Sequence, residues 1–144
     1  ANDEYKRLPE TVPNGDTSAT TLPQPDKAIV EAWERSVAAY ASYELPHDPE
    51  REDEEGYTPE QRNLLFIIDG AELLIQSNVA TTPRGAAIQL WTALGHLMPD
   101  QHDEAAVRRM DLDWFNAKDS EFDWPERLIL ASLRSLKKME ASNG

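Results

Sequence analysis

The chain has 144 residues, of which 27 are acidic and 14 basic, so its formal net charge is −13, and it contains no cysteine. This length fits one domain with a hydrophobic core, and the lack of cysteine excludes disulfides and thiolate metal sites. The negative charge disfavours direct binding to nucleic acid or anionic membranes, and it favours partners with a basic surface.

The first 25 residues contain four prolines and few apolar side chains. Such a composition does not offset the entropy lost on ordering, and it predicts an extended, flexible arm over residues 1–25. The alternative is an arm that orders against its own domain or a partner. The side chains available for this are Tyr5, Leu8, Val12 and Leu22. The chain has neither a basic start followed by an apolar run nor a membrane-length apolar stretch, so we expect a cytoplasmic protein.

A single helical domain is expected over residues 26–144, beginning with a helix from Asp26, as N-cap, to about Tyr43. Apolar residues recur there at spacings of four, four and three, which places them on one face. These residues are Ile29, Trp33, Val37 and Tyr40. An acidic loop over residues 44–57 follows.

The strongest local signal is Thr58-Pro59-Glu60-Gln61. Threonine caps free amides, proline suits the first helical position, and Gln61 completes a capping box. The helix should run to about Ser77. Its apolar residues are too widely distributed for a single stripe, so we predict that this is the central buried helix.

Three more helices follow along the chain. Thr82-Pro83 starts one that ends before Pro99, Asp100 caps a fourth with Val107, Met110 and Trp114 at helical spacing, and a last one begins near Pro125. Trp33, Trp91 and Trp114 fit apolar helical faces and are expected in the core. No segment alternates as a strand does. The prediction is an all-α protein, a compact bundle of about five helices with an extended, proline-rich N-terminal arm.

The acidic residues gather in two stretches. From Glu44 to Glu60 there are eight acids and one base, and from Asp100 to Glu126 there are nine acids and three bases. We predict that these stretches bind a partner. The candidate residues are Glu50, Glu52, Asp53, Glu54, Glu55, Asp111, Asp113, Asp119, Glu121, Asp123 and Trp124. Trp124 either packs over the start of the last helix or anchors a partner.

The remaining polar residues match no established metal site. One group lies close in sequence but fits no zinc framework. It comprises His96, Asp100, His102 and Asp103. A second group lacks the glycine and the final glutamate of a calcium loop. It comprises Asp111, Asp113, Asn116 and Asp119.

Asp69 and Glu72 interrupt the apolar run of the second helix. We expect them on an exposed edge; the alternatives are a buried ion pair with Arg62 or Arg84 and acid–base catalysis. Because no nucleophile, phosphate loop or paired-acid pattern is recognisable, we expect no cofactor, no bound metal and no enzymatic activity.

Residues 77–94 read SNVATTPRGAAIQLWTAL. This segment resembles one that recurs in uncharacterised small helical proteins of alphaproteobacterial genomes, prophages and plasmids. In those proteins a helix ends in a turn of small residues, Thr and Pro, and a Gly/Ala-rich helix follows. The likeness extends loosely over residues 33–113. It favours a mobile-element origin but implies no activity and no functional residue.

Three functions follow from these features. The first, which the sequence favours, is a non-enzymatic acidic module that binds a protein with a basic surface, such as a nucleic-acid-binding protein, through its helical surface and acidic patches. The second is a phage or mobile-element inhibitor of anti-CRISPR or anti-restriction type that mimics nucleic acid, which requires both acidic stretches to form one continuous face. The third is a small metal-binding or enzymatic protein.

Overall fold

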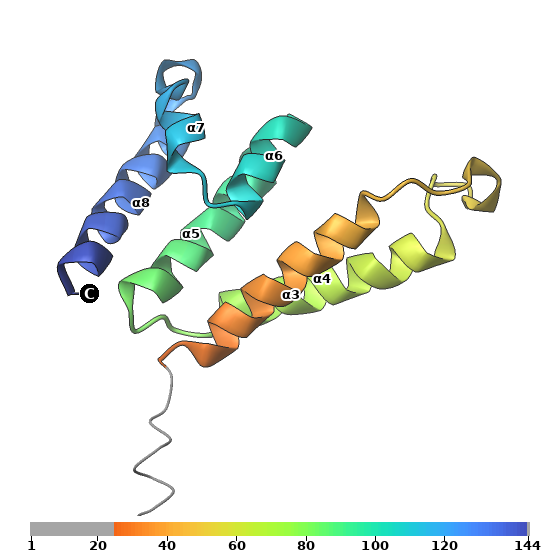
Figure 1. Cartoon of the computed structure of the whole chain (residues 1–144), viewed down its shortest axis with the longest axis horizontal. Coiled ribbons are helices and arrows are strands. Elements are labelled where there is room, and N and C mark those ends of the chain that lie inside the picture. The colour runs from red at the N-terminus through yellow and green to blue at the C-terminus, as the bar shows by residue number, and fades with distance from the viewer. Residues whose placement is uncertain (1–24, 144) are drawn as a thin grey trace, which may run out of the picture.

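The computed structural model describes residues 25–143, and all the regular structure in this range is helical (Figure 1). Six α-helices and two short 3₁₀ turns are present, and no strand occurs between residues 25 and 143. The predicted fold class, an all-α bundle, is confirmed. The arm predicted over residues 1–25 lies, apart from Pro25, outside the described residues. No helix of the described part is long and apolar enough to cross a membrane.

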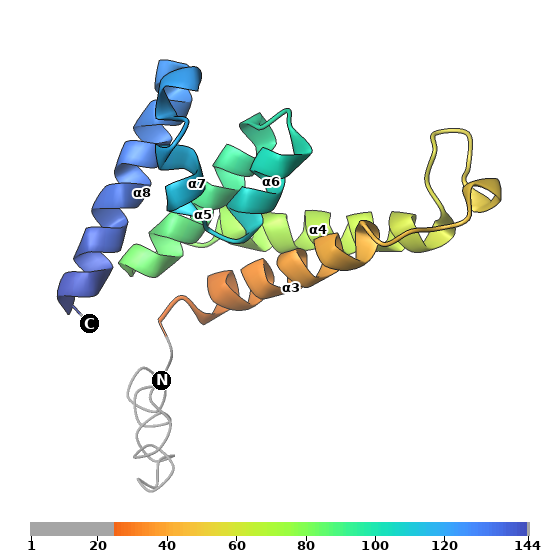
Figure 2. The same ribbon diagram turned by 45° about the horizontal axis from the view of Figure 1, so that its top comes forward.

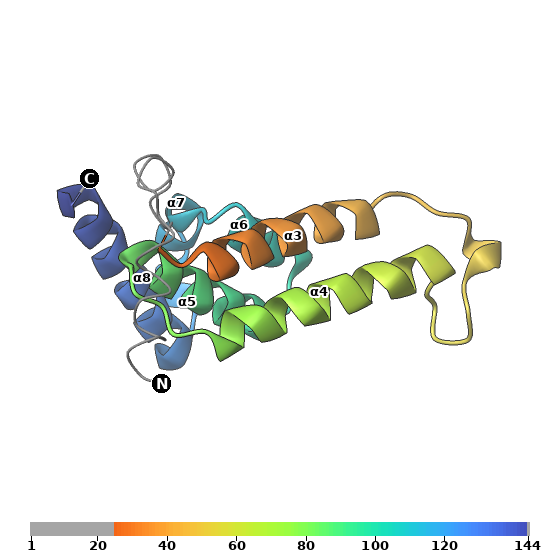
Figure 3. The same cartoon turned by 90° about the horizontal axis from the view of Figure 1, so that it is seen from below.

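Two of the helices, α3 (Lys27–Tyr43) and α4 (Pro59–Ser77), form an antiparallel hairpin that projects from the rest of the molecule (Figures 1 and 3). The body consists of α5 (Pro83–Leu97), α6 (Gln101–Arg108), α7 (Leu112–Asn116) and α8 (Trp124–Asn143). The 3₁₀ turns η1 (Pro49–Arg51) and η2 (Asp119–Glu121) lie in the connections before α4 and α8. Figure 2 shows α8 lying along α5, on the side away from the hairpin tip.

The central helix is α5, which packs against α3, α4, α6 and α8. Its residues Ile88, Trp91 and Leu94 are only 0–3% exposed. Helix α4 packs mainly against α3 and buries a single narrow face. The buried residues of α4 are Gln61, Ile68, Ala71 and Ile75. The prediction that α4 is the central buried helix is therefore wrong, because its apolar residues cover α3 on one side and meet solvent on the other.

Local sequence signals determine where α4 and α5 begin. The Thr58 hydroxyl accepts a hydrogen bond from the Gln61 backbone N–H, and the Gln61 side chain accepts one from the Thr58 N–H, so the predicted capping box is confirmed. At the start of α5 the Thr82 hydroxyl accepts from the Gly85 N–H. In both helices the cap satisfies amides that have no partner within the helix.

The predicted fourth helix is interrupted, and the structure divides it into α6 and α7. Met110 has a φ of 55°, in the left-handed region. Its N–H donates to the Val107 carbonyl and that of Asp111 donates to the Ala106 carbonyl, the pattern that closes a helix end. Asp111 then caps α7 by accepting from the Trp114 N–H. Helical spacing alone did not reveal this break, because the apolar positions of both helices follow a common period.

The predicted core tryptophans lie in or against the core. Trp33 and Trp91 are 9% and 3% exposed, and Trp114 packs against the same cluster. The indole N–H of Trp114 donates to the carboxylate of Asp103, which is 5% exposed and also pairs with Lys118 at 3.0 Å. This buried carboxylate links α6 to the region around α7.

Asp26 joins the start of the hairpin to the start of α5. It stands before α3 with a φ of 60°, but its side chain makes no capping hydrogen bond with α3. Its carboxylate instead accepts hydrogen bonds from the backbone N–H and hydroxyl groups of both Thr81 and Thr82. Asp26 is thus the N-cap residue of α3, as predicted, but its side chain does not cap this helix, since its partners lie 55 and 56 residues further along the chain.

Gly85 leaves the space that this carboxylate occupies. A Cβ atom at residue 85 would lie 2.0 Å from an Asp26 carboxylate oxygen. Burial raises the pKa of Asp26, but the hydrogen bonds from Thr82 and Thr81 outweigh it and hold the pKa below its ordinary value. The contact therefore stabilises the fold above the ordinary carboxyl pKa of 3.8, and the contribution is lost as the pH falls through the lowered value.

We predict that Asp26→Ala lowers the free energy of unfolding by about 2 kcal/mol, because hydrogen bonds to a charged group are lost. Gly85→Ala should also destabilise, because its methyl group displaces the carboxylate. The double variant should be no less stable than Asp26→Ala alone, since alanine at residue 85 then meets no carboxylate. Chemical denaturation of the four proteins measures this coupling. Strictly additive losses would contradict it.

Candidate protein-binding surfaces

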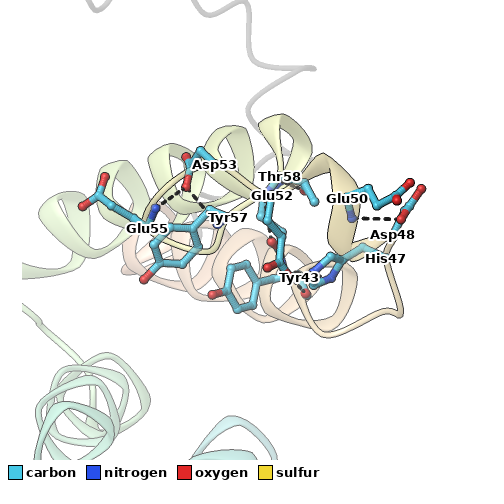
Figure 4. A network of polar contacts seen from close by, with 10 residues as sticks. Tyr43, His47, Asp48, Glu50, Glu52, Asp53, Glu55, Tyr57 and Thr58 are labelled. Atoms are coloured by element: carbon cyan, nitrogen blue, oxygen red, sulfur yellow. Dashed lines mark hydrogen bonds and ion pairs between the residues drawn. The ribbon is translucent and has the colours of Figure 1, made fainter.

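The acidic loop over residues 44–57 is tied to the start of α4 by ion pairs. Arg62 of α4 contacts Asp53 at 2.8 Å and Glu55 at 2.6 Å. Asp53 also accepts hydrogen bonds from the backbone N–H groups of Glu55 and Tyr57 (Figure 4). These contacts fold the loop around one guanidinium group.

Aromatic and imidazole side chains make further contacts within and beside the loop. The rings of Tyr43 and Tyr57 lie 6.5 Å apart, and the Arg62 guanidinium lies 4.6 Å from the centre of the Tyr57 ring. His47 Nε2 contacts the Glu52 carboxylate at 2.6 Å (Figure 4). The loop is thus an ordered connection with internal partners for much of its charge.

The hydrogen bond from Arg62, followed by that from the backbone N–H of Tyr57, holds the pKa of Asp53 at about 2. An Asp with a lowered pKa stays ionised and bound to its partner at neutral pH. Asp53 therefore serves first to hold the loop together.

The loop candidates fall into two groups. Glu52, Asp53 and Glu55 take part in the pairs described above, whereas Glu50 and Glu54 form no ion pair within residues 25–143. Glu50 and Glu54 are exposed, and their carboxylates are available for contact with a basic partner. The binding role of these residues stays a prediction.

The second acidic stretch shows the same division. Asp111 pairs with Arg109 at 3.2 Å, and Asp119 contacts both Arg127 and Arg134. Three other candidates form no ion pair in the part of the chain that the structure describes. They are Asp113, Glu121 and Asp123. All three are exposed.

Trp124 is the first residue of α8 and is 72% exposed. A tryptophan with this exposure does not pack over the start of its helix, so of the two predicted roles the stapling one is wrong. Contact of Trp124 with a partner stays a prediction. Its neighbours in the sequence include acids at residues 121, 123 and 126.

The candidate acids of the two stretches lie apart in the fold, although the stretches themselves meet where Arg108 pairs with Glu44. The loop over residues 44–57 forms the tip of the projecting hairpin, whereas α7, η2 and the start of α8 lie across the body from it in all three views (Figures 1, 2 and 3). They do not form the one continuous face that mimicry of nucleic acid requires.

A groove between α4 and α5 was not foreseen from the sequence. It has a volume of about 760 Å³, and its apolar residues are Leu73 and Ile75 of α4 and Ala93 of α5. The carboxyl groups of Asp69 and Glu72 lie along its α4 side, and no lysine or arginine of the described chain lines it. A groove of this size fits the side chains of a docked segment.

Gln89 joins α4 and α5 at one end of the groove. Its side-chain amide donates to the carbonyls of Ile75, at 3.0 Å, and Asn78, at 2.7 Å. Asp69 is exposed, as predicted, while the Glu72 side chain is 20% exposed and contacts His96 at 2.9 Å. The alternative pairing with Arg62 or Arg84 is wrong for Glu72.

A small cavity adjoins the groove. Its volume of about 50 Å³ gives room for a few water molecules. Tyr40 lines it, and burial, followed by the charge of Glu72, raises the pKa of this phenol to about 12. Arg108 stacks 4.6 Å from the centre of the Tyr40 ring and pairs with Glu44. This neutral, half-buried phenol supports the junction of α3, α5 and α6.

The residues considered as zinc ligands have separate structural roles. Asp100 caps α6 by accepting from the His102 N–H, Asp103 is buried against Trp114, and His96 lies beside Glu72. Among the residues between 25 and 143, no group of three or more histidines and acids is arranged to hold a metal ion.

The side of α4 that faces away from α3 carries exposed apolar residues and no charge; we call it the α4 outer face. It comprises Asn63, Phe66, Ile67, Gly70, Leu73, Leu74 and Ser77. Phe66 is 74% and Leu73 63% exposed. Large apolar side chains gathered at this exposure are typical of interaction sites. The sequence indicated this face, because the apolar residues of α4 are too widely distributed for one contact. The prediction that they are buried within the domain was wrong.

No model of a known protein family, no curated protein and no solved structure matches this chain. The resemblance of residues 77–94 to helical proteins of alphaproteobacterial mobile elements therefore has no support from these comparisons.

We predict that Arg62→Met raises the pKa of Asp53 from about 2 toward 3.8, because the largest cause of the lowering is removed. The pair stabilises the loop above pH 3.8, and this contribution is lost as the pH falls through about 2. Carboxyl-carbon NMR titration measures the change. Arg51→Met is the matched control, since Arg51 pairs with Glu60 and should leave Asp53 unaffected. An unshifted Asp53 in Arg62→Met would refute the assignment.

Proposed function

We propose that the protein is a non-enzymatic binding module that docks a basic amphipathic helix of a partner protein in the α4–α5 groove. The observation that carries this proposal is the composition of the groove, in which Leu73 and Ala93 provide apolar contact and Asp69 and Glu72 provide negative charge. An amphipathic helix placed in such a groove buries its apolar face and keeps its charged residues at the edge.

The negative charge of the chain and of the groove favours a basic partner helix. The chain has a net charge of −13, and the described lining of the groove contains no lysine or arginine. Lysines or arginines flanking an apolar face therefore match Asp69 and Glu72, whereas an acidic helix is repelled. The absence of cysteine fits a role in the reducing cytoplasm.

The two acidic stretches support binding at longer range. Exposed carboxylates such as Glu54 and Asp113 add to a negative potential that accelerates the approach of a basic partner. This effect needs no continuous face, so it tolerates the separation of the two stretches. The inhibitor that mimics nucleic acid has less support, because a row of carboxylates in register with phosphates requires that continuity.

A catalytic role also has less support. Of the polar groups near the groove, Glu72 is paired with His96 and Tyr40 is a neutral phenol beside a cavity of about 50 Å³. The cavity beside Tyr40 is far smaller than the pockets that bind small substrates, whereas Glu72 and His96 also line the larger groove.

We predict that a helical peptide with leucines on one face and lysines on the other binds the groove. NMR spectra of the isotope-labelled chain should show shifts at Gln89, Thr92 and Ala93. Ala93 is exposed, so Ala93→Trp should fill the groove and weaken binding at least about tenfold without unfolding the protein. Asp69→Lys should weaken it to a similar extent through charge repulsion.

Asp113→Lys is the matched control, because it changes the net charge as Asp69→Lys does, at an exposed acid of α7 that does not line the groove. It should bind the peptide nearly as the unchanged chain does. A peptide with the same composition but no helical periodicity tests for unspecific attraction. Equal weakening in both charge variants, or shifts confined to the acidic loop, would overturn the proposal.

A further inference from the structure

The α4 outer face has the residue spacing of a helix–helix seam. Asn63, Phe66, Gly70, Leu73 and Ser77 follow one another at spacings of three, four, three and four. This alternation lines up residues along a helix so that a second, nearly aligned helix packs against them. All five are exposed, and none is charged.

The apolar residues are placed symmetrically about Gly70. Phe66 and Ile67 lie four and three residues before it, and Leu73 and Leu74 lie three and four residues after it. In a two-fold dimer the same surface must contact itself, so each residue meets the residue at the opposite position. An antiparallel pair of α4 helices crossing at Gly70 sets Phe66 against the second copy's Leu74.

Gly70 permits close approach at the crossing point. A Cβ atom built there meets no atom within 4 Å, so nothing in the described part of the chain requires a glycine. Glycine within a helix is unfavourable compared with alanine, and two helices approach most closely where side chains are smallest. A helix from a second copy, placed over Gly70, gives this glycine a packing role.

Charge favours a second copy in the antiparallel orientation. Two chains of net charge −13 repel each other, and the uncharged α4 outer face allows contact without burying a carboxylate. The acidic loop precedes α4. An antiparallel pair places the two loops at opposite ends of the seam, whereas a parallel pair would place them side by side.

We infer that the α4 outer face is the seam of an antiparallel homodimer with its two-fold axis at Gly70. The seam from Asn63 to Ser77 is roughly 21 Å long, and a contact limited to one helix from each copy is expected to be weak, with a dissociation constant in the micromolar range. The inference does not rest on the proposed function, because Phe66, Gly70 and Leu74 do not line the α4–α5 groove.

Sedimentation velocity of the full chain, over concentrations from low micromolar to millimolar, tests the association. A shift from monomer to dimer is expected, and added salt should strengthen it by screening repulsion. Phe66→Asp and Leu74→Asp should each weaken the dimer at least about a hundredfold, because every substitution acts twice in a two-fold seam.

Leu128→Asp is the matched control, since Leu128 is 57% exposed on α8 and lies outside the seam. It should dimerise as the unchanged chain does. A chain that stays monomeric at millimolar concentration, or a Phe66→Asp variant that dimerises normally with an intact helical spectrum, would overturn the inference.

The absence of cysteine allows the orientation to be tested with single thiols. Gly70→Cys should cross-link to itself on mild oxidation. Asn63→Cys alone should not, but a mixture of Asn63→Cys and Ser77→Cys chains should form a mixed disulfide. Rapid self-cross-linking of Asn63→Cys would show a parallel pair and refute the antiparallel seam.

The two proposals fail independently. Phe66→Asp should abolish dimerisation and leave binding of the basic peptide intact, whereas Ala93→Trp should do the reverse. Leu73 is unsuitable for either test, because it belongs to both surfaces.

Discussion

The carboxylate of Asp26 determines how the hairpin meets the body. It is bound by Thr81 and Thr82 at the start of α5, and Gly85 leaves room for it. The hairpin is thus anchored at one end, next to the central helix, while its other end projects into solvent (Figure 3). Because α3 covers only one side of α4, this arrangement leaves α4 with a groove toward α5 and an uncovered outer face. Both candidate binding surfaces follow from that attachment.

The acidic residues divide into those that hold the fold and those that face solvent. Asp26, Asp53 and Asp103 each bind several donors, and for these the negative charge is a structural requirement. Residues such as Glu50, Glu54 and Asp113 have no such partner within residues 25–143 and maintain the negative potential of the surface. A count of charges along the sequence does not distinguish these two classes. The sequence therefore predicted a binding role for all the candidate acids, although some of them form ion pairs within the fold.

The features that the sequence predicts correctly are those with a local physical cause. The capping box at Thr58 and Gln61 acts within one helical turn, and it located the start of α4. Contacts that join distant segments, and residues whose backbone leaves its usual region, cannot be predicted in this way. Asp26 looks like an ordinary cap until its partners at Thr81 and Thr82 are known, and nothing in its neighbours indicates the left-handed conformation of Met110. The α4–α5 groove depends on how two helices diverge, which helical periodicity does not encode.

An apolar face on so acidic a protein has a physical consequence for specificity. Net repulsion opposes the approach of other acidic molecules at almost every orientation, so contact is favourable only where the charge is locally absent or a basic partner neutralises it. The α4 outer face meets the first condition and the α4–α5 groove meets the second. The two surfaces share one helix, and Leu73 borders both. A second copy seated on the outer face would therefore lie beside the groove, and Leu73 is the one described residue that the two surfaces have in common.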